Sequence, residues 1–574
     1  MATLNRGGIM KRVLVLMVML FCMCGNAWGA TEKSGLIYYP TDGASLVAIH
    51  NAVKARGLPA HYKLTYSGSG VSTPYIITSG VTFEDYETLE FENGAMLSYG
   101  SGVTLTFDRP EQVIAEPTQI IKDGSGWILF DNVGTIYANN WGEQTYDTVN
   151  KCYRACPSGS AAEGSNIILS GGTWDFGTNQ LDLLDKVVGL EGISSGIKYD
   201  DQRQATVISH TGTDSAVRMN YASSFEKIKI TGGAYGITLG NDSGTGAVAW
   251  GGVMRDCVVT QASTAGIKAY GIQLGLIENV FCEVNDSGVS VEGSGTNTHG
   301  TWINCRFAKN SEYGVYFGQN AQFKFYGCHF ESNGFEGVKN ENVALSGCLW
   351  DGCWLEDNND NASHATGYFN MSLLNSNNSD IIVTNNNFNG AYTTGNGHIS
   401  FQGDLTVSGN RYTGTSSGVY IKIAGTNDSL YNLGNDVLLD ATQVEFSSQN
   451  NFYYAVVPES LRHSREVLLG GSFNNVPRLV NVTIVNDSGG VVTYNLPDAA
   501  WYAGPIGFQV VETGDPIYIN PKPSDQIIPT CAVNTDIKSS GTIGDYLTLQ
   551  CTTGSVYGTT YWQEGINIGT WTSE

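Results

Sequence analysis

The sequence is poor in charge, and poorest in positive charge. Of its 574 residues 15% are charged, and 30 Lys and Arg residues stand against 54 Asp and Glu residues, so the formal net charge is −24. A surface this acidic repels phosphate backbones, so nucleic acid is not an expected partner. It also gives no general attraction to acidic polysaccharides, so a uronate polymer would need a local basic patch or a bound cation.

Beyond its N-terminus the sequence also lacks long apolar runs, so we expect no transmembrane segment. The run from Val13 to Cys24 has about 12 residues and is too short to cross a bilayer. Lys11-Arg12 precedes this run and small residues up to Ala30 follow it, which is the order of a secretory signal peptide. We therefore expect residues 1–29 to be cleaved and the protein to be secreted, into the periplasm or the extracellular space.

Cysteine is scarce as well, with 12 residues, and no spacing of Cys and His resembles a zinc site. We expect no metal site from these residues. Cys531 and Cys551 lie in a separate β-rich segment, and we predict a disulfide between them, which an exported protein can form. Four cysteines of the central segment are predicted to be buried, unpaired thiols: Cys257, Cys305, Cys328 and Cys353.

What the sequence does contain is a repeat in its centre. Five short phrases end in glycine followed by a β-branched residue, and these glycines are 30, 22, 26 and 23 residues apart. The glycines are Gly236, Gly266, Gly288, Gly314 and Gly337. Nine residues before each of the last four lies a Cys or Asn, for which we predict an inward ladder: Cys257, Asn279, Cys305 and Cys328. A period of roughly 20–30 residues is typical of a solenoid.

The repeat is built from strands. Apolar residues alternate with period two inside each copy, and Gly, Asn, Asp and Ser between the copies supply turns. Short strands with short turns and no intervening helices predict a parallel β-helix, in which each rung buries its inner side chains on the next. Helices are expected only over residues 42–56 and 147–156.

The pattern predicts four segments. Residues 1–29 are the signal peptide, and residues 30–135 form a cap and the first β coils. Residues 136–455 form the parallel β-helix. From residue 456 to residue 574 longer turns separate the alternating strands, which predicts a small C-terminal β-domain.

Residues 136–176 carry a resemblance to a known family. Trp141-Gly142, Asp147-Thr148 and Gly172-Thr173-Trp174 are similar to the N-terminal motif of the pectate-lyase-like superfamily, although Glu143, Tyr146 and Trp174 depart from its usual pattern. The resemblance implies an all-β, right-handed parallel β-helix. That motif caps the solenoid, so it implies no catalytic residue.

The C-terminal segment resembles the small β-domains that follow the β-helices of tailspikes and tail fibres. Asn495-Leu496-Pro497 and the segment from Gly544 to Leu549 carry this resemblance. It implies a homotrimer assembled through the C-terminal domain.

The superfamily acts mainly on polysaccharides, so the resemblance implies a glycan partner. The signature phrases of its enzymes are missing, including the Trp-Ile-Asp-His phrase of pectate lyases and the Gly-His-Gly phrase of polygalacturonases. Two functions stay open. One is an exported polysaccharide lyase or glycoside hydrolase, and the other is a non-catalytic, adhesin-like or tailspike-like protein that binds glycans.

A catalytic site, if present, is expected on the outer face of the solenoid, because neighbours of an inward strand residue point outward. Rungs stack about 4.8 Å apart, so Arg306, His329 and Trp354 are predicted to form one column. Trp354 would stack on a sugar ring, Arg306 would hold a negative charge, and His329 or a carboxylate would move the proton. Beside this column we expect Asp256 and Glu278 as catalytic carboxylates and Asn304 as a substrate-binding residue. The alternative is an ordinary solvated face.

Two other clusters are candidates. Lys268, Tyr316 and Lys339 are predicted to form a second outward column with Ser290, either contacting an acidic glycan or keeping the surface soluble. Four acidic residues crowd one turn and would suit Ca²⁺, which prefers oxygen ligands, although a solvated acidic turn explains them equally. These residues are Asp351, Glu356, Asp357 and Asp360. We expect no other cofactor.

Overall fold

The structure is a computed structural model that describes most of the chain between residues 36 and 573. Outside the description lie residues 1–35, 66–73, 117–118, 123–125, 158–163, 185, 197–204, 220–222, 241–248, 251, 271, 274, 293–297, 342, 359–368, 391–396, 414–418, 425–428, 433–443, 447–450, 455–464, 469–481, 487–491, 497–504, 511–516, 521–526, 529–536, 542–545, 554–559 and 574. The predicted signal peptide and Cys531 therefore fall outside the described residues. The chain divides into two compact units, Met1–Asn132 with Asn140–Gly142, and Val133–Asn139 with Glu143–Glu574.

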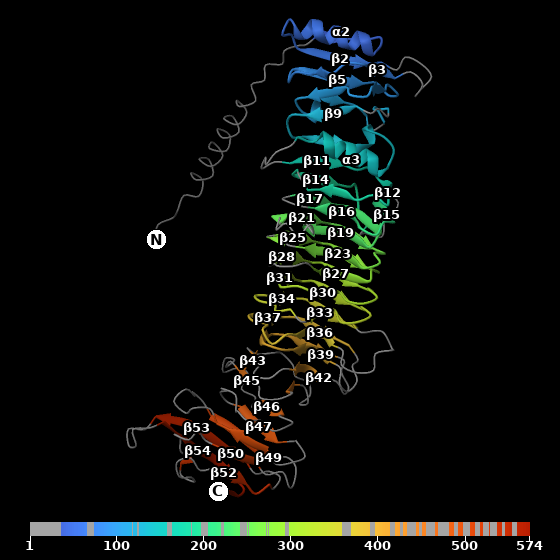
Figure 1. Cartoon of the computed structure of the whole chain (residues 1–574). Coiled ribbons are helices and arrows are strands. Elements are labelled where there is room, and N and C mark those ends of the chain that lie inside the picture. The colour runs from blue at the N-terminus through green and yellow to red at the C-terminus, as the bar shows by residue number, and fades with distance from the viewer. Residues whose placement is uncertain are drawn as a thin grey trace, which may run out of the picture. The chain divides into compact units, whose positions relative to one another are not determined.

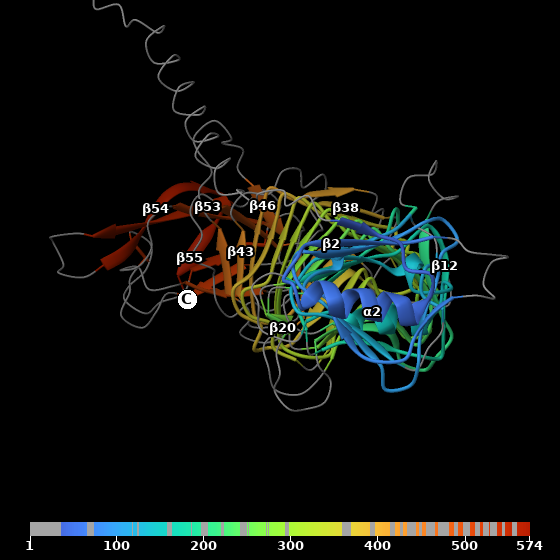
Figure 2. The same cartoon turned by 90° about the horizontal axis from the view of Figure 1, so that it is seen from above.

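The first unit begins with helix α2 (Gly43–Lys54), which confirms the helix predicted near residues 42–56. Asp42 caps it, because its carboxylate accepts from the backbone N–H of Ser45 at 2.7 Å while the Ser45 hydroxyl accepts from the N–H of Asp42 at 3.0 Å. Figures 1 and 2 show α2 beside β2. The strands of this unit are β1 (Leu36–Tyr38), β2 (Ala60–Leu64), β3 (Tyr75–Ile77), β4 (Val81–Thr82), β5 (Glu87–Phe91), β6 (Leu97–Tyr99), β7 (Thr104–Phe107), β8 (Val113–Ile114) and β9 (Trp127–Phe130).

The second unit contains three long parallel sheets, here called sheets 1, 2 and 3, and the helix α3 (Tyr146–Ala155). Sheet 1 consists of β10 (Thr135–Tyr137), β11 (Ser165–Ile168), β14 (Val188–Glu191), β17 (Ser224–Glu226), β21 (Val253–Arg255), β25 (Gly275–Glu278), β28 (Thr298–Ile303), β31 (Ala321–Tyr326), β34 (Leu349–Asp351), β37 (Ile381–Thr384), β40 (Asp404–Ser408), β43 (Ser429–Asn432) and β45 (Asn451–Tyr454). Sheet 2 consists of β12 (Gly172–Gly177), β15 (Thr206–His210), β18 (Lys229–Gly232), β22 (Val258–Thr260), β26 (Phe281–Glu283), β29 (Arg306–Ala308), β32 (His329–Glu331), β35 (Trp354–Glu356), β38 (Asn387–Asn389) and β41 (Arg411–Thr413). Sheet 3 consists of β13 (Leu181–Leu183), β16 (Ser215–Met219), β19 (Tyr235–Gly240), β23 (Ala265–Tyr270), β27 (Ser287–Val291), β30 (Val315–Phe317), β33 (Val338–Glu341), β36 (Phe369–Leu374), β39 (Gly397–Phe401), β42 (Val419–Ile423) and β44 (Val444–Phe446).

Each rung of the solenoid contributes one strand to each sheet in turn. β25, β26 and β27 form one such rung, and each pairs in parallel with the corresponding strand of the next, β28, β29 and β30. Figure 1 shows these rungs following one another along one axis. The predicted all-β parallel β-helix is confirmed.

Stacked side chains fill the interior between the sheets. Trp302, Phe325 and Trp350 face one another on three successive strands of sheet 1 and are fully buried. The ring centroids of Trp302 and Phe325 are 5.9 Å apart, and those of Phe325 and Trp350 are 5.5 Å apart, in stacked geometry. Because the same inward position recurs on every rung, each ring packs on its equivalent in the next rung, which buries a large apolar area in a narrow core.

The corner between sheets 1 and 2 is a sharp turn made by one residue in the left-handed conformation. This residue has φ between +51° and +65° in eight successive rungs: Lys227, Asp256, Asn279, Asn304, Gly327, Gly352, Asn385 and Gly409. Gly, Asn and Asp tolerate positive φ better than other residues, which explains the composition of this position. A second left-handed residue follows the strands of sheet 2, at Gln261, Val284, Lys309, Ser332 and Asp357. Most strands of sheet 2 are therefore only three residues long.

The inward column directly after the first corner contains the predicted buried thiols. Cys257, Cys305, Cys328 and Cys353 are unpaired and at most 1% exposed, which confirms the prediction. The placement of Asn279 in this column is wrong. Val280 takes the inward position, because Asn279 forms the left-handed corner and one residue fewer separates Val280 from Gly288 than separates Cys305 from Gly314.

A ladder of buried asparagines, absent from the predictions, lines the end of sheet 2. Asn285, Asn310, Asn333 and Asn358 occupy equivalent positions on successive rungs, each five residues after the inward residue that follows the corner. The amide nitrogen of each donates to the amide oxygen of the next, at 3.3, 2.8 and 2.7 Å along the ladder. Each amide nitrogen also donates to a backbone carbonyl, so the turn groups of neighbouring rungs are satisfied without water.

The C-terminal region is also built of strands: β46 (Arg465–Leu468), β47 (Val482–Asn486), β48 (Val492–Asn495), β49 (Pro505–Val510), β50 (Ile517–Asn520), β51 (Ile527–Ile528), β52 (Ile537–Ser539), β53 (Tyr546–Thr553), β54 (Thr560–Ile568) and β55 (Trp571–Ser573). Several of these pair antiparallel, including β49 with β53 and β53 with β54, in contrast to the parallel rungs. Cys551 lies in β53, but its predicted partner Cys531 is outside the description, so the disulfide stays a prediction.

Candidate functional site

The outer face of sheet 2 carries two columns of side chains. Left-handed corners bound the three-residue strands from β22 to β35 on both sides. The middle residue of each three-residue strand points inward, and its first and third residues point outward. From β22 to β41 the first residues are Val258, Phe281, Arg306, His329, Trp354, Asn387 and Arg411. The third residues are Thr260, Glu283, Ala308, Glu331, Glu356, Asn389 and Thr413.

Arg306 lies between two carboxylates of the third-residue column. Its Nη1 is 2.9 Å from Oε1 of Glu283, and its Nη2 donates to Oε2 of Glu331 at 3.1 Å. All three side chains are a quarter to a third exposed, so water reaches them. The guanidinium therefore bridges three successive rungs and has both terminal nitrogens engaged. Glu283 and Glu331 were not among the predicted site residues, although each lies two residues after a member of the first column.

Trp354 presents its indole to solvent in a fixed orientation. Its ring is stacked on His329, with ring planes 7° apart and centroids 6.4 Å apart. Its Nε1 donates to Oε2 of Glu356 at 2.8 Å, and the other oxygen of Glu356 accepts from Nδ2 of Asn389 at 2.6 Å. Trp354 is 37% exposed, so part of its ring system is open to solvent. The result is an exposed aromatic surface held by an imidazole on one side and a carboxylate at its edge.

The three other residues predicted for this column lie elsewhere. Glu278 ends β25 in sheet 1, where its Oε2 accepts from Nε of Arg255 at 2.9 Å. Asp256 and Asn304 are left-handed corner residues, and the Asp256 carboxylate accepts from Nδ2 of Asn279 at 3.1 Å. They were predicted at outward strand positions beside this column, and the structure places them at corners or in sheet 1 instead, because the period of two stops at each corner. The structure brings together Arg306, His329 and Trp354, as predicted.

The comparisons agree with this architecture. A family model described as a right-handed beta helix region matches residues 215–388, which include most of the rungs that hold the two columns. The chain is a right-handed parallel β-helix protein.

Solved structures with a similar course of the chain come from phages and bacteria. ORF18 of Geobacillus virus E2 is 12% identical with a TM-score of 0.33, and 76% of each chain is covered. The gp42 tailspike of Acinetobacter phage vb_AbaP_AS12 is 11% identical with a TM-score of 0.38, over 78% of this chain and 83% of that one. PfbA, a surface adhesin of Streptococcus pneumoniae, is 11% identical with a TM-score of 0.20, over 87% and 94%. No protein with a curated description matches the chain.

The second predicted column lies on sheet 3 of the β-helix, and its register is confirmed. Lys268, Ser290, Tyr316 and Lys339 pair in sequence on β23, β27, β30 and β33. Nζ of Lys268 is 3.4 Å from a carboxylate oxygen of Glu292, and Nζ of Lys339 is 3.0 Å from that of Glu336. Ser290 and Lys339 are at most 9% exposed. Both lysines are therefore neutralised by nearby carboxylates, and this column presents little positive charge.

The described residues of the predicted acidic turn lie on different parts of the β-helix. Asp351 ends β34 in sheet 1, Glu356 belongs to sheet 2, and Asp357 forms the second corner. Asp360 lies outside the described residues. Within the described ranges, no group of three or more His, Cys, Asp or Glu side chains is arranged to hold a metal ion. Calcium binding at this turn stays a prediction.

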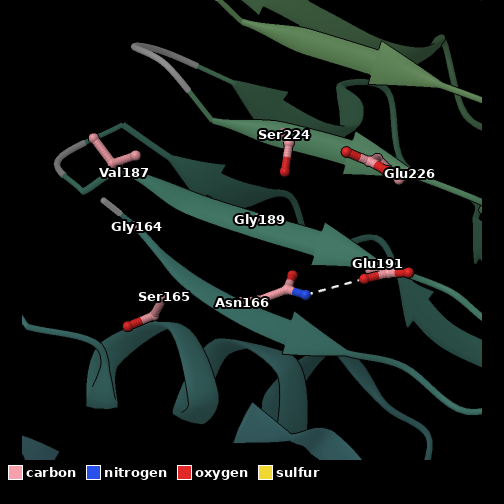
Figure 3. Close-up of a pocket in the computed structure, with 8 residues that line it drawn as sticks. All are labelled: Gly164, Ser165, Asn166, Val187, Gly189, Glu191, Ser224 and Glu226. Atoms are coloured by element: carbon pink, nitrogen blue, oxygen red, sulfur yellow. Dashed lines mark hydrogen bonds between the residues drawn. The ribbon is translucent and has the colours of Figure 1, made fainter. Parts of the chain in front are cut away.

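A shallow polar hollow lies on sheet 1 near the beginning of the β-helix (Figure 3). Its lining residues are Gly164, Ser165, Asn166, Val187, Gly189, Glu191, Ser224 and Glu226. Gly189 opens the hollow, since a Cβ there would lie 2.7 Å from Oδ1 of Asn166. Glu191 accepts from Nδ2 of Asn166 at 3.0 Å and from Lys227 at 2.6 Å, and the Lys227 ammonium holds the pKa of this carboxyl below its usual range. Of the polar side chains that line the hollow, Asn166 and Glu191 are thus bonded to each other.

Among the helices that the structure describes, none is long and apolar enough to cross a membrane.

Proposed function

We propose that this protein binds an extracellular glycan on the outer face of sheet 2, with Trp354 as the platform for a sugar ring. The observation that carries the proposal is the exposed indole, fixed by stacking on His329 and by its hydrogen bond to Glu356. The C–H face of a pyranose is apolar and packs on the electron-rich face of an indole. Because the ring is already held, binding does not have to immobilise it.

Acceptors for sugar hydroxyls surround this platform. Glu331 lies opposite Glu356 on the neighbouring strand, and Asn389 follows on the next. Each carboxylate has two oxygens and about four lone-pair positions, so it can accept from a sugar hydroxyl while keeping its present partner. Hydrogen bonds to ionised acceptors are stronger than those between neutral groups. A ring stacked on Trp354 would therefore find charged acceptors along one edge.

The test is the affinity of Trp354→Ala for oligosaccharides found by screening the wild-type chain on a glycan array. Trp127→Ala is the matched control, because Trp127 is 43% exposed but lies on β9 of the first unit. Loss of an aromatic anchor typically costs 2 kcal/mol or more, so we expect Kd to rise by about thirtyfold in Trp354→Ala and to stay unchanged in Trp127→Ala. Equal effects of the two substitutions would place the site elsewhere.

Glycoside hydrolysis is the second candidate, and the neighbouring carboxylates favour it. Glu331 and Glu356 are register neighbours on adjacent strands, so one column carries two carboxylates, and retaining glycosidases use such a pair. His329 adds a titratable group next to the platform. A lyase would need a cation to neutralise the uronate, and the Arg306 guanidinium already bridges Glu283 and Glu331.

Release of reducing ends from the bound glycan tests this candidate. Glu331→Gln and His329→Gln should each lower the rate by about a hundredfold if these groups transfer protons. Glu226→Gln, a carboxylate of sheet 1, is the control and should leave the rate unchanged. Binding without any release of reducing ends, and without an unsaturated product, would leave the glycan-binding function alone.

The sequence also supports export and assembly as parts of this proposal. The charged, apolar and small-residue order of residues 1–29 would send the chain out of the cytoplasm, where a glycan is accessible. The antiparallel strands after Val457 would then drive trimerisation, as the tailspike resemblance implies. Mass spectrometry of the protein from culture medium tests cleavage after residue 29. Light scattering of a chain truncated before residue 457 tests the trimer, which the truncated chain should fail to form.

A further inference from the structure

We infer that this face selects its glycan by charge, preferring amino sugars, tolerating neutral sugars and excluding uronates. The inference rests on the proposed function and names the chemical class of its ligand. It comes from the arrangement of charges around Trp354, and it departs from the expectation that Arg306 would hold a negative charge of the ligand.

The outward positions around Trp354 have a negative balance. In the five described strands β26, β29, β32, β35 and β38 the outward residues include three carboxylates, Glu283, Glu331 and Glu356, and one guanidinium, Arg306. Leaving His329 aside, three negative charges and one positive charge give a net charge of −2 on this part of the face. The chain as a whole is also strongly acidic, at −24. A ligand with negative charge is therefore repelled both at a distance and on arrival.

The one guanidinium among these described strands, that of Arg306, already forms two ion pairs. Arg306 has one terminal nitrogen 2.9 Å from Glu283 and the other 3.1 Å from Glu331. A uronate could bind Arg306 only by displacing one of these carboxylates, which would then lie beside the incoming charge. The exchange replaces one ion pair by another and gains no net attraction, while it adds a like-charge contact.

Two carboxylates lie at the edge of the platform. Glu356 accepts from Nε1 of Trp354 itself at 2.8 Å, and Glu331 is its register neighbour on β32. A charge on a sugar stacked over the indole would lie near Glu356, with Glu331 on the adjacent strand. At about 4 Å in a water-like dielectric, one such contact changes affinity about fivefold, in favour of an ammonium and against a carboxylate. Two such contacts change affinity by about twenty-five-fold for either sign of charge, so the ammonium should be preferred to the carboxylate by at least about tenfold.

The lysines of sheet 3 do not supply an alternative site for acidic sugars. Lys268 and Lys339 each lie within 3.4 Å of a carboxylate, and Lys339 is only 9% exposed. The two lysines are thus balanced by two carboxylates, which leaves no net positive charge from these four residues.

Three hexasaccharides of equal length test the inference: glucosamine, N-acetylglucosamine and galacturonate, measured by calorimetry on the full chain at low ionic strength. We expect glucosamine to bind at least about tenfold more tightly than galacturonate, with N-acetylglucosamine between them. Raising the salt to about 0.5 M should weaken glucosamine binding and leave N-acetylglucosamine binding nearly unchanged, because salt screens exposed charges. Galacturonate binding as tightly as glucosamine, or failure of glucosamine to bind, would overturn the inference.

A variant that lacks two of the carboxylates tests whether their charge sets the ligand preference. In Glu283→Gln combined with Glu331→Gln the local net charge changes from −2 to 0 and Arg306 loses both ionic partners. Galacturonate should then bind about tenfold more tightly than to the wild type, and glucosamine more weakly. If the double variant unfolds, Glu331→Gln alone should move both affinities in the same directions by a smaller factor. Unchanged selectivity in a folded variant contradicts the inference.

Trp354→Ala distinguishes an error in the proposed binding site from an error in the proposed charge selection. If this substitution abolishes binding but galacturonate and glucosamine bind equally to the wild type, the site stands and the charge selection is wrong. If it leaves the binding of all three probes intact, the proposed site itself is wrong. Trp127→Ala serves again as the control that should change nothing.

Discussion

The asparagine ladder is expected to be a principal source of stability in the solenoid, and Asn333→Leu tests it. Asn333 is fully buried, and its side chain makes four hydrogen bonds. Its oxygen accepts from the backbone N–H and the side-chain amide of Asn310, at 3.2 and 2.8 Å. Its nitrogen donates to the carbonyl of Phe307 at 3.0 Å and to the amide oxygen of Asn358 at 2.7 Å. Leucine has a similar volume but none of these groups.

The loss of unfolding free energy depends on which partners of Asn333 keep another hydrogen bond. The amide nitrogen of Asn310 still donates to the carbonyl of Cys282 at 3.2 Å, and Oδ1 of Asn358 still accepts from the N–H of residue 333. The carbonyl of Phe307 belongs to the parallel ladder of β29 and β32, so only the N–H of Asn310 is left without a partner inside the core. A buried polar group without a partner costs about 1–3 kcal/mol, so we expect Asn333→Leu to cost about 2 kcal/mol.

Urea unfolding followed by tryptophan fluorescence measures this loss, with Cys328→Ala as the control. Cys328 is equally buried on the same rung, but its thiol is a weak donor, to the carbonyl of Trp302 at 3.4 Å. We expect Cys328→Ala to cost about 1–2 kcal/mol, mainly through lost packing. If Asn333→Leu lowers the free energy of unfolding by less than Cys328→Ala, the ladder does not stabilise the rungs as argued.

Three further predictions follow from single features of the fold. Cys305, Cys328 and Cys353 should react with a thiol reagent only after unfolding, and without reduction, because they are buried and unpaired; reaction of the native protein would contradict this. Val284 is a β-branched residue at φ +59° and is 53% exposed, so Val284→Asn should raise the free energy of unfolding by about 1 kcal/mol in a urea titration, and a loss would contradict the strain. Burial opposes ionisation of Glu87, but hydrogen bonds from His50, Tyr62 and the N–H of Glu84 outweigh this effect and lower the pKa of Glu87. The ionised Glu87 side chain therefore stabilises the fold at pH values above its unfolded pKa of about 4.3. This stabilisation is lost as the pH falls through the lower pKa of the folded state. Melting temperatures measured down to pH 3 should therefore fall less steeply for Glu87→Gln than for the wild type.

The sequence was sufficient to predict the solenoid and one column of its face. Inward residues recur with the rung, and equivalent residues on successive parallel strands must lie side by side. Arg306, His329 and Trp354 each directly follow an inward cysteine, so their alignment required only the period of the repeat and the alternation within one strand. Both of these are local properties that a single sequence displays.

The neighbours of this column could not be predicted by the same rule, because alternation does not continue through a corner. Asp256 and Asn304 were expected to point outward from a strand, and instead each makes the turn that begins it. The equivalent positions in the next rungs hold Asn279, Gly327 and Gly352. Asp, Asn and Gly are the residues that best tolerate positive φ, so this composition could have indicated the corner. The ion pairs of Arg306 with Glu283 and Glu331 then follow, because the third residue of each strand is the next outward position.

The brevity of these strands is also what makes sheet 2 the best candidate surface. A three-residue strand exposes two outward side chains, so each rung presents one residue of each column and a polymer lying along the axis would meet the same two positions on every rung. Between residues 143 and 446, among the Phe, Tyr and Trp side chains that the structure describes, Trp354 is the most exposed. On sheet 3 the outward residues Ser290 and Lys339 are buried, and on sheet 1 Glu191 of the hollow is already bound to Lys227. An exposed ring beside carboxylates that still have accepting positions is therefore found on sheet 2, and a binding site for a linear glycan should be sought there first.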